Sequence, residues 1–304
     1  MVAQRVMVSG QVVYGPGRRP LSHTWVVLHQ VQMGAGGGPI DSVRTGSGGR
    51  FTLVIARPDT AAMYVVSSWY SGIAYFSEPV PPGRRAVTLQ PILVYDTAST
   101  GPPIGLHRRL VTVARPRKDG TRAVLELLAL ENPGKATRIT NDTTRPTWMG
   151  ALPRGVIQFE AGQGDVSGEA VGRRGDRVIV VGPIPPGEPK QLTYSYTLPA
   201  TMSALAIPID QPTGEVDLLL EDTTTTVAAP ALEVGGVQLI EQRHFASYRA
   251  RALSPGASVV LTFPRAGFRA EFLVPYVVGL VAVALLVGLV IALRKQPSAP
   301  LRPE

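Results

Sequence analysis

Cysteine is absent from the chain, and lysine is scarce. Without cysteine there are no disulfides, no thiolate nucleophile and no cysteine-ligated zinc site. Lysine occurs only at Lys118, Lys135, Lys190 and Lys295. The sequence before Lys118 therefore cannot form the Lys–Asn isopeptide crosslink that staples some β-sandwiches.

The sequence also lacks the short motifs of common catalytic sites. We find no G-x-S-x-G elbow, no H-E-x-x-H pair, no phosphate-cradling glycine loop and no dinucleotide fingerprint. His23 and His29 share one face of an expected strand, but no third ligand is near in sequence, so we predict no metal site. We predict no catalytic residue and no cofactor.

Charge and composition favour a turn-rich β protein. The net charge is +8, with the basic residues scattered rather than gathered in a basic helix, so nucleic-acid binding is not predicted. Glycine and proline contribute 32 and 28 residues, which fits many short strands separated by turns. Pro-Gly pairs at 82–83, 186–187 and 255–256 favour turns in which the glycine has positive φ.

The first module is expected over residues 5–97, with about seven strands. Residues 24–31 and 50–56 read as strands, and the glycine-rich 34–39 reads as a flexible loop. A linker of small residues and prolines follows at 98–105.

Several residues of this module resemble the carboxypeptidase regulatory-like domain of bacterial envelope proteins. They are Gly10-Gln-Val-Val13, Pro20-Leu21, Val26-Val-Leu28 and the run from Thr45 to Phe51. The resemblance implies a transthyretin-like β-sandwich in which the turn before Phe51 makes a hairpin and Phe51 plugs the core. The family name refers to a noncatalytic appendage, so no peptidase activity is implied.

Beyond the linker, alternating patterns predict further Ig-like sandwiches. Residues Leu192, Tyr194, Tyr196 and Leu198 alternate with small polar residues, which is typical of a half-buried strand. We predict a second sandwich at 106–200 and a third β module at 201–266. Because the third range is short for an independent core, the two ranges could instead form one sandwich.

Residues 274–293 carry no charge over the length that crosses a bilayer as a helix. Arg294 and Lys295 follow at once, so the tail 294–304 is expected in the cytoplasm. We therefore predict an all-β, tandem-sandwich ectodomain on one transmembrane helix. Ala284, Gly288 and Ala292 stand four residues apart, a spacing that lets two helices approach and suggests a homodimer.

The sequence indicates less directly on which side of the membrane the ectodomain lies. The N-terminal residues lack the apolar run of a signal peptide, and strand-like sequence begins at Val6. We expect export of the ectodomain to the periplasm or cell surface, with a leader upstream of this start. The alternative is a tail-anchored protein with its bulk in the cytosol.

Two sets of residues are candidate ligand surfaces. The aromatic set is Trp25, Trp69, Tyr70 and Tyr75, which could stack on a glycan or fill the core of the first sandwich. The basic set is Arg115, Arg117, Lys118 and Arg122, which could contact an anionic partner or lipid phosphates.

The function expected from these patterns is noncatalytic. The ectodomain would bind or scaffold a partner protein in a membrane complex. A glycan-binding surface on the first module is one alternative. An enzyme, or an accessory subunit of one, with a site at a module junction is the other.

Overall fold

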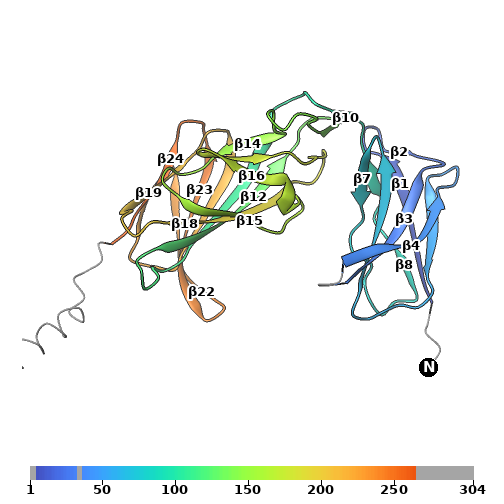
Figure 1. Ribbon diagram of the computed structural model, residues 1–304, viewed down its shortest axis with the longest axis horizontal. Coiled ribbons are helices and arrows are strands. Elements are labelled where there is room, and N and C mark those ends of the chain that lie inside the picture. The colour runs from blue at the N-terminus through green and yellow to red at the C-terminus, as the bar shows by residue number, and fades with distance from the viewer. Residues whose placement is uncertain (1–4, 33–35, 265–304) are drawn as a thin grey trace, which may run out of the picture. The chain divides into compact units, whose positions relative to one another are not determined.

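The computed structural model describes residues 5–32 and 36–264. These residues fold into strands with one 3₁₀ turn, η1 (Gly168–Ala170), and the predicted all-β class is confirmed (Figure 1). The apolar run 274–293 and the tail 294–304 lie outside the described residues. Within the described part of the chain, no helix is long and apolar enough to cross a bilayer.

The first sandwich contains two sheets. One is built on β1 (Val6–Tyr14), which pairs with β2 (Arg19–Pro20), β5 (Arg50–Ile55), β8 (Ala86–Thr88) and β9 (Ile92–Val94). The other has the order β4-β3-β6-β7, from β3 (Trp25–Gln32), β4 (Gly36–Arg44), β6 (Met63–Tyr70) and β7 (Ile73–Phe76). The inward side chains of both sheets form one apolar core.

Phe51 occupies that core, as the family resemblance implied. Its ring packs where Gly10 has no Cβ; a Cβ there would lie 2.5 Å from the ring. The expected hairpin before Phe51 is wrong, because β4 and β5 belong to different sheets. The turn instead carries the chain from one sheet to the other, and the buried Thr45 hydroxyl donates to the Leu21 carbonyl at 2.6 Å.

The glycine-rich segment also differs from expectation. Gly36–Pro39, predicted as part of a loop, begins β4 and pairs with the end of β3. Glycine has a low strand propensity, so the residues alone did not predict a strand here. Backbone hydrogen bonds with the neighbouring strand β3 hold the segment in the sheet. By contrast, Gly83, Gly187 and Gly256 all have positive φ, which confirms the Pro-Gly turns.

The second sandwich is built on a seven-stranded sheet of order β15-β18-β12-β11-β20-β23-β22. Its strands are β11 (Gly105–Val113), β12 (Arg122–Glu131), β15 (Ile157–Ala161), β18 (Lys190–Leu198), β20 (Thr213–Leu220), β22 (Leu232–Ile240) and β23 (Arg243–Leu253). Two three-stranded sheets complete the fold. Their orders are β14-β17-β16 and β19-β24-β21.

The strands of these smaller sheets are short. They are β14 (Trp148–Ala151), β16 (Val171–Arg174), β17 (Arg177–Val180), β19 (Ala204–Pro208), β21 (Thr226–Ala228) and β24 (Ser258–Thr262). Two residues each from β10 (Thr97–Ala98) and β13 (Thr137–Arg138) form a separate parallel ladder.

Strands from the predicted ranges 106–200 and 201–266 hydrogen-bond in one sheet, because β20 lies between β11 and β23. These ranges therefore share one sandwich rather than forming two modules. The inward positions of β18 are Leu192, Tyr194, Tyr196 and Leu198, all buried, as the alternation predicted.

This core holds one buried ion pair. Arg109 donates to both oxygens of Glu126, at 2.7 and 3.1 Å, and to the Pro208 carbonyl at 3.1 Å. The hydroxyls of Tyr194 and Tyr196 donate to the same carboxylate at 2.9 and 2.7 Å. Burial and then the Glu126 charge raise the pKa of both tyrosines well above the usual value, so they stay protonated donors.

Candidate interaction surface of the first sandwich

An aromatic surface covers the outer face of the β4-β3-β6-β7 sheet. We define it by Trp25, His29, Met63, Trp69 and Phe76. Trp25, Trp69 and Phe76 are 48%, 62% and 60% exposed, although large aromatic side chains are usually buried in a sandwich core. This is the largest gathering of exposed aromatic rings in the described part of the chain.

Strand pairing brings these side chains together. Val26 pairs with Ser68, so Trp25 and Trp69 occupy neighbouring positions at the end of the β3–β6 ladder. Ser67 pairs with Phe76 in the next strand. Since successive side chains alternate between faces, Trp25, His29, Trp69 and Phe76 all point outward.

Local contacts hold part of this surface in place. The Arg44 guanidinium lies 4.7 Å from the centroid of the Trp25 ring, within the range of a cation–π contact. His29 Nε2 hydrogen-bonds with the Ser67 hydroxyl at 2.8 Å, and its ring lies 6.1 Å from the Phe76 ring. These contacts restrict side-chain rotation before any partner binds, which lowers the entropic cost of binding.

The structure separates the four predicted aromatic residues. Tyr75 is buried, and its hydroxyl lies 2.8 Å from the Tyr95 carbonyl and 2.7 Å from the Thr137 hydroxyl. Tyr70 lies away from the aromatic surface and donates to Asp96 at 3.1 Å, beside Tyr14. The predicted ligand set thus divides into two outward tryptophans, one core tyrosine and one tyrosine bound to a carboxylate.

Met63 is a member of this surface that sequence reasoning missed as a ligand contact. The signal was present, because β3 has apolar residues on both faces: Val26 and Leu28 inward, Trp25 and Val27 outward. A strand of this kind in an antiparallel sheet has an apolar outer face, which often marks an interaction site.

The basic set is also divided. Arg115, Arg117 and Lys118 are exposed in the loop between β11 and β12, which we call the basic loop. Arg122 is instead buried at the start of β12 and contacts Asp222 at 3.1 Å, so it is structural. The predicted helix face, Ala284, Gly288 and Ala292, lies outside the described residues.

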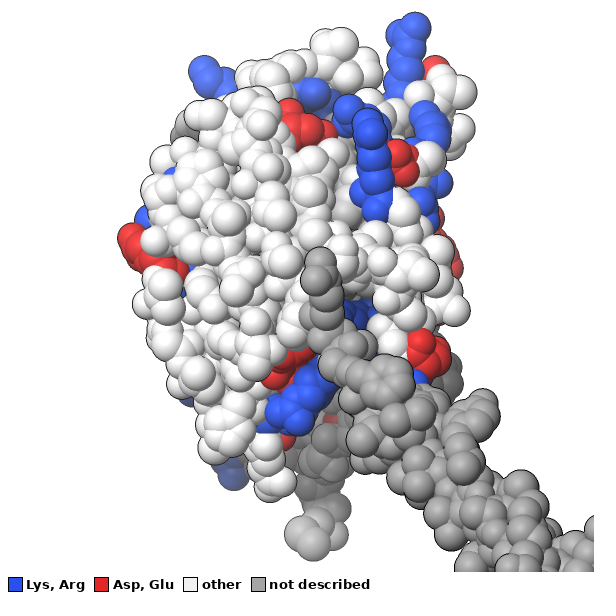
Figure 2. All heavy atoms as spheres, turned by 90° about the vertical axis from the view of Figure 1, so that its left-hand side faces the viewer, with Lys and Arg blue, Asp and Glu red and all other residues white. Residues whose placement is uncertain are grey.

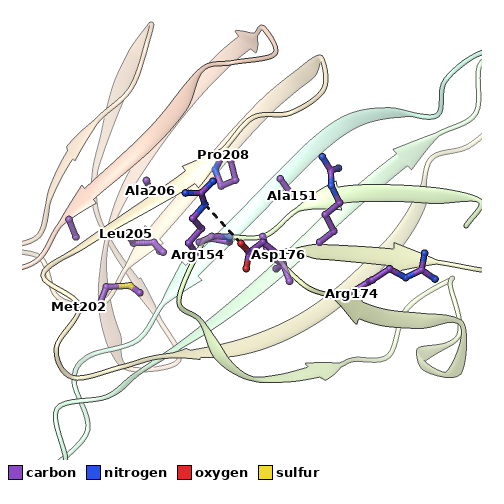
Figure 3. A pocket seen from close by; sticks show the side chains of 12 residues that line it. Ala151, Arg154, Arg174, Asp176, Met202, Leu205, Ala206 and Pro208 are labelled. Carbon is purple, nitrogen blue, oxygen red and sulfur yellow. Dashed lines mark ion pairs between the residues drawn. The ribbon is translucent and has the colours of Figure 1, made fainter. Parts of the chain in front are cut away.

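A cleft of about 660 Å³ opens beside β19 in the second sandwich (Figure 3). Arg154 and Asp176 point toward each other there, 4.0 Å apart, and Met202, Leu205, Ala206 and Pro208 line the opposite side. Asp176 is the one carboxylate in the lining, and no histidine or serine accompanies it. This residue set does not form a nucleophile–base pair.

The outer face of β11, β20 and β23 carries a charged ladder. Asp217 accepts from both Arg108 and Arg249 at 2.7 Å, and Arg251 contacts Glu215 and Glu233. Burial alone would raise the pKa of Asp217, but hydrogen bonds from the two arginines lower it overall. Each charged side chain of the ladder therefore has an oppositely charged partner within the ladder. Within the described residues, no cluster of three or more His, Asp or Glu side chains could hold a metal ion.

Comparison with protein-family models and with curated proteins finds no match. Solved structures with partial likeness include an M1 zinc metallopeptidase from Deinococcus radiodurans, at 12% identity and a TM-score of 0.35, covering 53% of this chain. The chain spans 42% of that peptidase.

Two further likenesses are weaker. The major pilin SpaD of Corynebacterium diphtheriae is 11% identical with a TM-score of 0.23, over 68% of this chain and 60% of the pilin. A DUF3823 family protein from Parabacteroides merdae is 13% identical with a TM-score of 0.22, over 67% and 88%. Likenesses at this level carry no inference about activity.

Proposed function

We propose that the chain is a noncatalytic, single-pass membrane protein of the cell envelope whose first sandwich binds a partner protein through the aromatic surface. The observation that carries this proposal is the exposure of Trp25, Trp69 and Phe76 on one face of the sheet. Exposed apolar patches of this kind are typical of interaction sites, and tryptophan is enriched among residues that dominate binding energy.

The neighbours of the rings favour a protein over a glycan. Val27, Val65 and Met63 lie on the same outer face, between and beside the rings. A sugar platform also needs free polar groups for the sugar hydroxyls, and the Ser67 hydroxyl here is already bonded to His29. An aliphatic and aromatic face suits an apolar protein surface, with Arg44 at its margin available to a carboxylate.

The glycan alternative keeps one supporting observation, since Trp25 and Trp69 are both accessible. The two proposals predict different competitors. A soluble polysaccharide would displace bound material only in the glycan case, whereas Trp25→Ala and Trp69→Ala would abolish binding in both.

Site-specific photo-crosslinking tests the protein partner. A photoreactive residue replacing Val65, at the centre of the aromatic surface, should form a defined protein adduct in cells. The matched control replaces Thr52, an outward residue of β5 on the opposite sheet. Adducts that survive Trp25→Ala/Trp69→Ala, or that form equally from position 52, would contradict the proposal.

Membrane anchoring rests on the uncharged run 274–293, which nine residues, 265–273, separate from the last described residue, Pro264. The full chain should float with membranes and resist carbonate extraction, whereas a chain ending at Pro264 should be released. Protease protection in spheroplasts then tests the extracytoplasmic location. Digestion of the sandwiches only after the inner membrane is broken would favour the tail-anchored alternative.

A further inference from the structure

The β22–β23 hairpin exposes an apolar strip. Strand β22 is the edge of the seven-stranded sheet, and the hairpin extends from the body of the second sandwich (Figure 1). Val234, Val237 and Leu239 are 72%, 61% and 66% exposed. We call these three residues the hairpin strip.

A β-bulge places the strip on one side of the hairpin. The register shifts between Val234 and Gly236, so Val234 lies opposite Tyr248 and Val237 opposite Ala246. Tyr248 and Ala246 are two residues apart and share a face. Without the extra residue, Val234 and Val237 would point to opposite sides.

The chain leaves the described structure at the same end of the sandwich as the hairpin tip. Leu220, the last residue of β20, pairs with Ala246 near the start of β23. A short loop leads from Leu220 to Thr226, which pairs with Thr262 at the end of β24. The hairpin tip and the exit toward 274–293 therefore lie at one end.

The basic loop lies at this end too, since β11 runs parallel to β20 and Val113 pairs with Leu220. Glu221 links the loop to the hairpin. It accepts from Arg243 Nε at 2.9 Å and from the backbone N–H of Arg115 at 2.9 Å. Arg117 and Lys118 are exposed.

The sheet beside the exit presents few charges. Its exposed outward residues are Ala204, Ala206, Thr226, Ala228, Ser258 and Thr262. Figure 2 shows a broad uncharged area on the side where Figure 1 labels β19 and β24, with both basic and acidic residues at its margins. Such a surface can approach a membrane without stripping water from charged groups.

We propose that this end of the second sandwich rests on the bilayer, with the hairpin strip in the interfacial region and Arg117 and Lys118 on anionic lipid phosphates. The inference rests on the proposed membrane anchor. The nine residues 265–273 reach at most about 30 Å when extended, which keeps the strip close to the lipid surface. Apolar insertion and cationic contact then act together, as in other interfacial binding.

The absence of cysteine makes a direct test simple. Leu239→Cys in the full chain is labelled with an environment-sensitive dye and reconstituted in vesicles containing anionic lipid and nitroxide-labelled lipid. The control is Ser254→Cys, in the turn at the opposite end of β23. We expect several-fold stronger quenching at 239 than at 254, and Val237→Cys should repeat the result.

Two further arms separate the outcomes. Arg117→Ser/Lys118→Ser should reduce quenching at 239 in anionic vesicles and leave it unchanged in neutral ones. If the chain floats with the vesicles but positions 239 and 254 are quenched equally, the inference is wrong while the anchor stands. If the dye at 239 is shielded without lipid quenching, the free edge binds a second copy of the chain instead, and the inference is wrong. If the chain does not float, the proposed anchor itself fails.

Discussion

Arg109 and Glu126 form a two-pronged ion pair inside the second sandwich, with nitrogen–oxygen distances of 2.7 and 3.1 Å. The side chains come from adjacent strands, β11 and β12, and both are buried. Burial opposes the charge of Arg109, but the Glu126 carboxylate raises its pKa overall. The two tyrosine hydroxyls saturate the carboxylate, so each member of the cluster depends on the others.

Breaking this ion pair should destabilise the second sandwich. Arg109→Leu leaves an uncompensated buried carboxylate and should lower the free energy of unfolding by about 3–5 kcal/mol. Urea unfolding followed by the fluorescence of the buried Trp148, in a Trp25→Phe/Trp69→Phe background, measures the effect in the same sandwich. Replacing the exposed Arg154 by leucine is the control. A loss below 1 kcal/mol for Arg109→Leu would mean that water or a neighbour replaces the guanidinium.

Phe51 should anchor the first sandwich. Phe51→Ala removes a buried ring that packs on Gly10, and should cost about 3–5 kcal/mol. Val54→Ala, on the same strand but facing solvent, should stay within about 0.5 kcal/mol of the parent. Calorimetry of the two variants checks this contrast, and equal losses would show that Phe51 is not the core residue described.

Glu221 should make the hairpin base acid-sensitive. The hydrogen bond from Arg243 lowers the pKa of Glu221 below its ordinary 4.5 in the folded chain. Its stabilising contribution is therefore present above pH 4.5 and is lost as the pH falls through the lowered folded value. Glu221→Gln should cost about 1 kcal/mol at neutral pH, because Arg243 is half exposed.

The same variant should flatten the acid dependence. Between the ordinary and the lowered pKa, Glu221→Gln should lose less stability than the parent as the pH decreases. Denaturation series at several pH values provide the comparison. A variant that keeps the full acid dependence would assign it to another carboxylate, such as Asp222, whose pKa the Thr224 and Arg122 side chains lower despite partial burial.

Gly236 should be required for the bulge. It has φ of +80°, and although nothing would touch an added Cβ, the backbone conformation is strained for other residues. Gly236→Ala should destabilise the hairpin by about 1 kcal/mol. Gly38→Ala in β4 is the control, since that position has open space and no positive φ. Hydrogen exchange of the β22 amides is the measurement, and unchanged exchange would contradict the assignment.

The residue pattern alone was enough for the strands of the core. Leu192 to Leu198 alternate strictly, the Pro-Gly pairs mark their turns, and Phe51 sits in a recognisable glycine-bearing segment. These features depend on side-chain periodicity and on allowed φ values within a few residues, and both are local properties that the chain carries wherever it folds.

Which strands pair with one another was decided only by the tertiary structure. Nothing local places β20 between β11 and β23, makes Gly36–Pro39 a strand, or moves Val234 to the side of Val237. The pattern of β3 is apolar on both faces, so it could not show that Trp25 would be the outward residue. The pattern of β7 likewise could not show that Tyr75 would be buried. Hydrogen-bonding partners far apart in sequence decide each case, because a strand's exposed side depends on which sheet it joins.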